Sequence, residues 1–392
     1  MLSQISPMNQ IINRAPYLCL FFVFGFAAFL FRPSDSLLKY AILFSSALCI
    51  IFSYQNNDIK KSLESYREFI FPWLPWYICV IPLTFFHDDK NIYLNGLLLL
   101  SLPFFALSKI AIKRQLVIFV ISITASLLSA TIVFDVLLNG LTQNILGVNK
   151  NVLVPCVTLL AICSFAFLLF ESKDQNLTLK ITLIFSVCIS VVCIILTEVR
   201  TAILALLSLI PLTILLNKKN RLKHISLLLL ICGVTIICFY FSGRLQQGID
   251  DLVRYQAGNP NSSWGIRLEL WKLSLDAFMI KPIFGWGEEA FAEMIKAGCE
   301  FPVSSFHPGH SHNDFFNILV SIGAVGVLCW ISTIFLLLKN SATDPTRISF
   351  LIATLAMGLT ERLFLGNRAC CYLTAIIWLL LYLTSKSKTT AK

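Results

Sequence analysis

Long apolar runs separated by short polar segments occupy most of this chain. A transmembrane helix needs roughly 17–25 mostly apolar residues to cross the hydrocarbon layer, and about twelve such helices fit the sequence. The predicted spans are 15–31, 37–54, 69–86, 92–110, 115–138, 151–170, 179–197, 200–216, 224–242, 314–338, 348–366 and 370–385. The pattern therefore predicts an all-α integral membrane protein, a polytopic bundle of about twelve transmembrane helices.

A long polar stretch interrupts this alternation between the ninth and tenth predicted spans. It divides the chain into transmembrane helices 1–9 in residues 1–242, a large loop in residues 243–313, and helices 10–12 with a polar tail in residues 314–392. Residues 265–280 of the loop carry apolar side chains at helical spacing, which predicts an amphipathic helix lying on the membrane surface. A turn is predicted just before it, at residues 259–263.

Composition agrees with a membrane protein. Hydrophobic residues make up 57% of the chain and charged residues 13%, against roughly 25% charged residues in a soluble domain. The first apolar run lacks a small-residue cleavage site and precedes many further spans. We therefore interpret it as a retained first helix rather than a signal peptide.

The net charge of +10 comes from basic residues dispersed between the apolar runs. Such dispersal favours a role in membrane topology over nucleic-acid binding. By the positive-inside rule, the Lys- and Arg-rich short segments are cytoplasmic; they are 54–66, 113–114, 171–180, 217–223, 339–347 and the tail. Both termini are then predicted to be cytoplasmic, and the long loop is predicted to face the outer side.

Thirteen cysteines lie mostly inside apolar runs, where they behave as small hydrophobic residues. Cys299 is the exception, because it lies in the long polar loop. It can pair with Cys370 or Cys371 if these lie at the same membrane face, or it can remain a free thiol.

Charged residues at membrane depth are costly and are therefore functional candidates. Arg200 lies at the predicted outer end of a span. It can anchor the helix end by extending toward the interface, or its guanidinium can grip phosphate oxygens as a two-pronged fork. Arg267 in the loop helix offers a second guanidinium, or belongs to a solvated face.

Three histidines, His307, His310 and His312, end the polar loop. His312 stands at the start of span 314–338, where Asn313 can cap the helix. A histidine there is either structural or a general base, since its ordinary pKa is near ~6.5. No nearby Cys pair or compelling carboxylate completes a zinc set, so we predict no metal.

The last predicted spans contain two further features, a pair of glycines and a pair of charged residues. Gly323 and Gly326 lie one helical turn apart, a spacing that would let another helix approach closely. Glu361 and Arg362 are predicted inside span 348–366, near its outer end. They form either a structural polar network or part of a substrate site.

Several of these residues combine into motifs. His312-Asn313 is followed, after nine residues, by Gly323-x-x-Gly326. The other motifs are Arg200-Thr201-Ala202, Gly265-x-Arg267-x-x-x-Trp271 and Pro282-x-x-Gly285-Trp286-Gly287. Over roughly residues 195–330 the chain resembles the bacterial O-antigen ligase family, within the wider O-antigen ligase and polymerase superfamily. Val199 stands where that family usually has serine.

The resemblance implies a GT-C-like glycosyltransferase of the bacterial inner membrane with a periplasmic active site. Its reaction in lipopolysaccharide biosynthesis would transfer O-polysaccharide from undecaprenyl diphosphate to the lipid A–core, with inversion and without metal or other cofactor. Its partners would be these two lipid-linked substrates and membrane lipids, with no nucleic acid.

The resemblance also assigns roles to particular residues. His312 would be the catalytic base, and Arg200 and Arg267 would bind the donor diphosphate and stabilise its growing charge. Substrate contacts would also come from His310, Asn313 and Arg362.

Other functions fit parts of the same pattern. An O-antigen polymerase and a protein O-oligosaccharyltransferase use the same lipid-linked donor. A transporter would also have about twelve spans, but we find no repeat of broken helices, and the polar residues gather at one face rather than at the midplane.

Overall fold

The computed structural model describes residues 64, 67–86, 114–146, 148–171, 175–216, 221–287, 289–297, 309–363, 373–374, 377–382 and 384. The predicted spans 15–31, 37–54 and 92–110 lie outside the described residues, and span 370–385 lies only partly within them. His307, Cys299, Cys370 and Cys371 also lie outside them.

The described chain is almost entirely helical. Among the described residues, five helices are long and apolar enough to cross a membrane. They are α7 (Arg114–Asn139), α8 (Lys150–Glu171), α9 (Leu177–Thr197), α11 (Arg221–Phe241) and α15 (Asp314–Ser341). The prediction of an all-α membrane protein is therefore confirmed, whereas the total of about twelve spans stays a prediction.

Shorter helices complete the bundle. They are η2 (Phe71–Trp73) with α4 (Leu74–Phe86), α10 (Arg200–Leu216) and α16 (Pro345–Gly358). A small antiparallel hairpin, β1 (Asn144–Ile145) and β2 (Val148–Asn149), joins α7 to α8.

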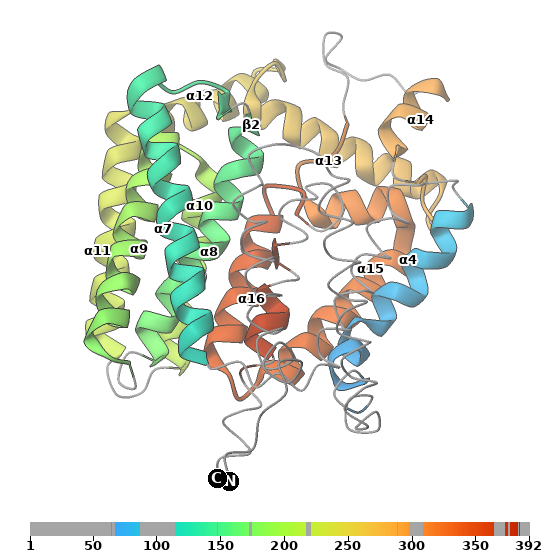
Figure 1. Cartoon of the computed structure of the whole chain (residues 1–392). Coiled ribbons are helices and arrows are strands. Elements are labelled where there is room, and N and C mark those ends of the chain that lie inside the picture. Colours follow the sequence, from blue (N-terminus) through green and yellow to red (C-terminus); the bar gives the residue numbers. More distant parts are fainter. Residues whose placement is uncertain are drawn as a thin grey trace.

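Helix α8 forms the centre of the bundle, with α7, α9, α10 and α16 packed around it (Figure 1). Its side chains Val157, Leu160 and Phe167 are fully buried. This explains its sequence, because a helix that is apolar on all sides has no face suited to water. Helix α15 instead packs against α4.

At one end of the bundle, a buried cluster of charged side chains holds three helices together. Arg114, at the start of α7, donates from Nε to Oε2 of Glu171 at 2.8 Å. It also donates from Nη1 to Oδ2 of Asp344 at 2.9 Å. The guanidinium therefore ties the first turn of α7 to the end of α8 and to the cap of α16, since Asp344 also accepts from the backbone N–H of Thr346.

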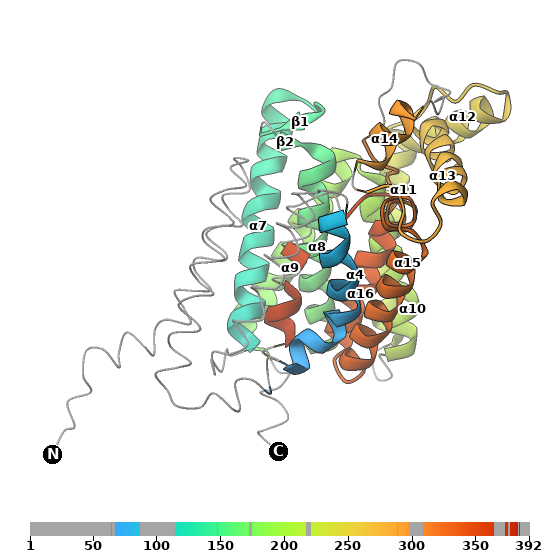
Figure 2. The same cartoon turned by 90° about the vertical axis from the view of Figure 1, so that its right-hand side faces the viewer.

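The opposite end carries the three helices of the polar stretch, α12 (Arg244–Gln256), α13 (Ser263–Ile280) and α14 (Ala290–Lys296). Figures 1 and 2 show them at the same end of the bundle as the β1–β2 hairpin. Gly243, with φ +74°, is the turn residue between α11 and α12, a conformation that glycine adopts without steric cost.

The predicted loop helix is present as α13, but its predicted amphipathic character is wrong. Ser262 caps it by accepting from the backbone N–H of Gly265. Leu270 and Ala277 are buried, yet Leu275 and Met279 are exposed. Apolar residues therefore occupy two faces, because one face packs against α14 and α15 while the other points away from the protein.

The amphipathic helix is α12, whose individual position was not predicted. Its residues Leu245, Ile249, Leu252 and Val253 expose one apolar face, whereas its other face is polar. Its four charged residues and three glutamines, interspersed with the apolar ones, disguise this spacing in the sequence.

Candidate active site

The first guanidinium of the site begins α10. A tight turn at Glu198, with φ +55°, ends α9 and places Arg200 at the first position of the next helix. The Nη2 group of Arg200 donates to the carbonyl oxygen of Arg244 at 3.0 Å. Gly248 of α12 lies against the same guanidinium, and a Cβ at that glycine would be 3.6 Å from Nη1. Helix α12 thus fixes the position of Arg200.

The second guanidinium comes from α13. Arg267 donates from Nη2 to Oε1 of Glu361 at 3.1 Å. Gly265 allows the start of α13 to lie close to the preceding turn, since a Cβ there would be 2.6 Å from the carbonyl oxygen of Pro260. The glycine of this motif therefore serves to position the arginine two residues later.

Both arginines line one cleft of 190 Å³. Among the residues that the structure describes, its charged lining consists of four basic residues, Lys150, Arg200, Arg244 and Arg267, and two acidic residues, Glu198 and Glu361. The formal balance is 4 − 2 = +2, which favours an anionic ligand.

Lys150, Arg244 and Glu198 were not predicted as site residues. Arg244 pairs with Glu198, and the two come from different parts of the chain. The signal in the sequence was their position at span ends, which is where charged residues are common for topological reasons alone.

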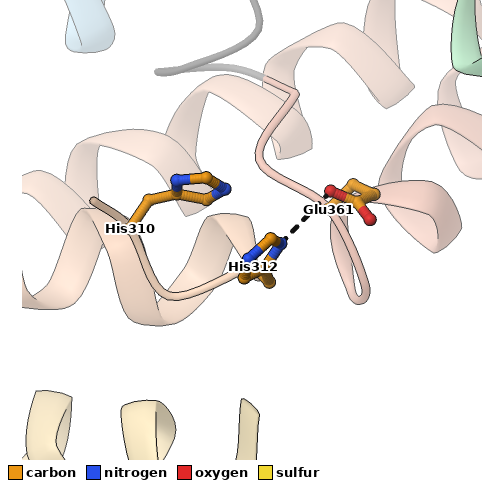
Figure 3. A group of neighbouring side chains, drawn as sticks. All are labelled: His310, His312 and Glu361. Carbon is orange, nitrogen blue, oxygen red and sulfur yellow. Dashed lines mark ion pairs between the residues drawn. The ribbon is translucent and has the colours of Figure 1, made fainter. Parts of the chain in front are cut away.

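The imidazole of His312 lies beside the second arginine. Its Nδ1 is 3.5 Å from Oε2 of Glu361, the carboxylate that also accepts from Arg267 (Figure 3). His312 has φ +51°, a left-handed conformation that is uncommon outside glycine. Strain of this kind is often found at functional sites. Arg267, Glu361 and His312 thus form one connected polar chain.

Asn313 holds this arrangement together. Its Oδ1 accepts from the backbone N–H of Phe316 at 3.2 Å, which confirms the predicted cap of α15. Its Nδ2 donates to the carbonyl oxygen of Leu359 at 2.9 Å, next to the segment that carries Glu361. These bonds use the side chain for positioning, and a substrate contact of Asn313 stays a prediction.

The prediction that Glu361 and Arg362 lie inside a helix is wrong. Helix α16 ends at Gly358, and the chain then turns. The Asp314 carboxylate lies against Gly358, where a Cβ would be 2.6 Å from Oδ2. The Thr360 hydroxyl donates to Thr201 at 3.2 Å, close to Arg200. Contacts from α15 and α10 therefore end the helix and direct Glu361 into the cleft.

His310 is the second histidine of the site. Its ring centroid lies 4.2 Å from that of His312. Burial lowers the pKa of His310 to about 3, and His312 and the positive charges of Arg362 and Arg267 contribute to this shift. The ring is therefore neutral near pH 7 and can accept or donate a hydrogen bond without adding charge.

The site also has the distances of a possible metal set. The ligand atoms of His310, His312 and Glu361 all lie within 4.8 Å of one another. The carboxylate of this set comes from Glu361, which is distant from the histidines in the sequence. Its charge is, however, already paired with Arg267, and Arg362 lies near His310. These guanidinium groups disfavour a divalent cation, so the donor set fits a metal poorly.

The two glycine motifs meet at a break in α15. Gly323 has φ +73° and ψ −163° and breaks α15. Across this break, Trp286 N–H donates to Val320 O at 2.9 Å, and Ala324 N–H donates to Pro282 O at 2.8 Å. The expectation that Gly323 receives another helix is therefore wrong, because the 282–287 loop inserts there and satisfies the backbone groups freed by the break.

The remaining motif residue, Trp271, links α13 to the histidine segment. Its indole Nε1 donates to the carbonyl oxygen of Ser311 at 3.0 Å, and its ring stacks on Phe316 with centroids 5.3 Å apart. The same helix thus positions both Arg267 and the segment that ends in His312.

Fold and site together define a multi-pass α-helical membrane protein with a cationic cleft beside an imidazole–carboxylate pair. Residues 185–331 match the family described as O-antigen ligase. This match confirms the predicted resemblance to that family for the segment that carries most of the site. The activity of that family is of the O-antigen ligase and polymerase type, carried out by membrane enzymes.

The chain is also similar to an uncharacterized protein of Haemophilus influenzae. The two are 24% identical over 331 residues, which cover 78% of this chain and 81% of the relative. The similarity therefore extends well beyond the family match.

Proposed function

We propose that this protein is an O-antigen ligase of the bacterial inner membrane. It transfers O-polysaccharide from undecaprenyl diphosphate to a hydroxyl of the lipid A–core, on the periplasmic side. The observation that carries the proposal is the cleft in which Arg200 and Arg267 lie next to the His312–Glu361 pair.

The guanidinium groups act on the leaving group. Cleavage of the bond between the anomeric carbon and the diphosphate oxygen leaves negative charge on the diphosphate. Fixed donors aimed at such charge stabilise the transition state. Arg200 and Arg267 come from different helices and can hold the diphosphate from two sides, which in this proposal replaces a metal ion.

The imidazole acts on the acceptor. Nδ1 of His312 faces Glu361, so a proton on Nδ1 leaves Nε2 free to accept the proton of the attacking hydroxyl. The new bond joins that oxygen to the anomeric carbon, the diphosphate leaves from the opposite side, and the configuration inverts. Glu361 then stabilises the imidazolium, as a carboxylate does in a catalytic triad.

The helix α12 supports the proposed membrane position of the site. Its apolar face, defined above, continues from exposed Tyr240 and Phe241 at the end of the membrane helix α11. An amphipathic helix of this kind lies at a bilayer interface. Lipid-linked donor and acceptor would then reach the cleft at the depth of their headgroups, with the loop periplasmic and both termini cytoplasmic.

A deletion strain tests the proposal through its lipopolysaccharide profile. We expect bare core and accumulated lipid-linked polysaccharide, restored to a full O-antigen ladder by the wild-type gene. Core that carries a single repeat would instead identify a polymerase, and loss of glycan from an exported protein would identify an O-oligosaccharyltransferase.

A further inference from the structure

A second cavity adjoins the cationic cleft. This trough has a volume of 490 Å³ and lies along α12. The residues of its lining that matter here are Glu198, Arg244, Gln247, Asp250, Asp251 and Arg254. No motif in the sequence pointed to it, because only the fold places Glu198 beside α12.

The trough and the cleft share one wall. Glu198, Arg244 and Gln247 line both. Arg244 pairs with Glu198 and donates from Nη1 to Oε1 of Gln247 at 2.7 Å, so the three side chains form one polar cluster that borders both cavities. A ligand held in the cleft is therefore within reach of the trough.

The two cavities differ in charge. The described lining of the trough has two basic residues, Arg244 and Arg254, and three acidic ones, Glu198, Asp250 and Asp251. Its formal balance is 2 − 3 = −1, against +2 in the cleft. The trough therefore disfavours a second phosphate and suits an uncharged polar ligand.

Asp251 points to such a ligand independently. Its side chain is only 5% exposed. Its Oδ2 has no hydrogen-bond partner among the residues that the structure describes. A buried carboxylate oxygen without a donor is costly, and hydroxyl groups of a bound ligand would supply the missing donors.

We propose that the trough is a saccharide subsite for the glycan of the lipid-linked donor. Carboxylates accept from sugar hydroxyls, while Arg254 and the amide of Gln247 donate to them. The donor is favoured over the acceptor because its first sugar is bonded directly to the diphosphate. A sugar attached to a diphosphate in the cleft would lie next to the trough, since the two cavities share Glu198, Arg244 and Gln247. The assignment rests on the proposed function of the cleft.

Two probes separate the subsite from the phosphate site. One is bare undecaprenyl diphosphate, and the other is the lipid-linked glycan extracted from the native host. Their dissociation constants are measured with purified protein in nanodiscs, without acceptor. Wild-type protein should bind the glycan-bearing lipid more tightly than the bare lipid.

The variants are Asp251→Asn, which keeps the side-chain shape, and Arg254→Ala, which changes an exposed residue. Each should weaken binding of the glycan-bearing lipid about tenfold, the loss expected for one charged hydrogen bond. Neither should weaken binding of the bare lipid, which also reports correct folding. Asp276→Asn, an exposed carboxylate on α13, is the matched control and should change neither.

The outcomes distinguish the two claims. Equal affinity of wild-type protein for both probes, or unchanged glycan binding in Arg254→Ala and Asp251→Asn, overturns the subsite and leaves the diphosphate site intact. Failure of the wild-type protein to bind either probe overturns the proposed function as well.

Discussion

The Nδ1 atom of His312 lies 3.5 Å from Oε2 of Glu361, and this contact joins two segments that are distant in the sequence. The contact depends on the early end of α16, which brings Glu361 out of a helix. It gives the predicted base a carboxylate partner that the histidine motif does not contain.

Replacing the base should reduce transfer strongly. For His312→Ala we expect a loss of about 10²–10⁴-fold in kcat, the range for general-base assistance. Purified enzyme with lipid-linked donor and lipid A–core gives the rate, and a lipopolysaccharide gel of the complemented deletion strain gives the result in cells. A full O-antigen ladder from His312→Ala would refute the assignment.

Glu361→Gln tests the positioning role of the carboxylate. The amide keeps the size of the side chain but cannot stabilise an imidazolium, so kcat should fall to a value between those of wild type and His312→Ala. Donor affinity should not fall, because Arg267 loses a competing anion. Glu361→Asp should restore part of the rate. Equal losses in kcat and in donor affinity would mean that Glu361 only maintains the fold.

Catalysis should depend on the planar guanidinium of Arg200, which can form two parallel hydrogen bonds, and not only on its positive charge. Arg200→Ala should lower kcat by about 10²–10³-fold, as removal of one transition-state donor does. Arg200→Lys should recover only part of this, since an ammonium group cannot form two parallel bonds. Lys272→Ala, which removes an exposed charge from α13, is the control. Full activity of Arg200→Lys would reduce the role of Arg200 to that of a simple positive charge.

Gly323→Ala should destabilise the protein. The backbone at φ +73° and ψ −163° is accessible essentially only to glycine, and the 282–287 loop leaves no room for a Cβ. We expect the free energy of unfolding to fall by about 1–3 kcal/mol, which would be visible as a lower Tm in detergent. Gly233→Ala in α11, where a Cβ meets nothing within 4 Å, should leave Tm unchanged or raise it. Similar Tm values for both variants would contradict the importance of this break.

Lowering the pH should reduce the stability of the folded protein through protonation of His310. Its pKa is about 3 in the folded protein against 6.5 ordinarily. The unfolded chain therefore binds the proton first, and stability is lost as pH falls from about 6.5 toward 3. His310→Gln removes this dependence, so the difference in Tm between pH 7.5 and pH 4.5 should be smaller in the variant. Identical differences would show that the surroundings of His310 relax to accept its charge.

Much of this protein is determined by local sequence. The span boundaries of α7, α8, α9 and α10 follow from apolar runs, because the length of a membrane helix is set by the bilayer. Caps such as Asn313 depend on nearby residues and could also be predicted from the sequence. The candidate residues Arg200, Arg267 and His312 were likewise identified from the sequence, by their positions and motifs.

Tertiary structure decided how these residues work together. The position of Glu361 follows from contacts that α15 and α10 make with the end of α16, and no local pattern records them. Gly323 similarly receives a loop rather than a helix because its motif partner folds back from α13. The cleft and trough exist only where α12 crosses the ends of α9 and α10. Sequence alone thus determined the helices and the candidate side chains, whereas long-range packing decided which charges share a cavity.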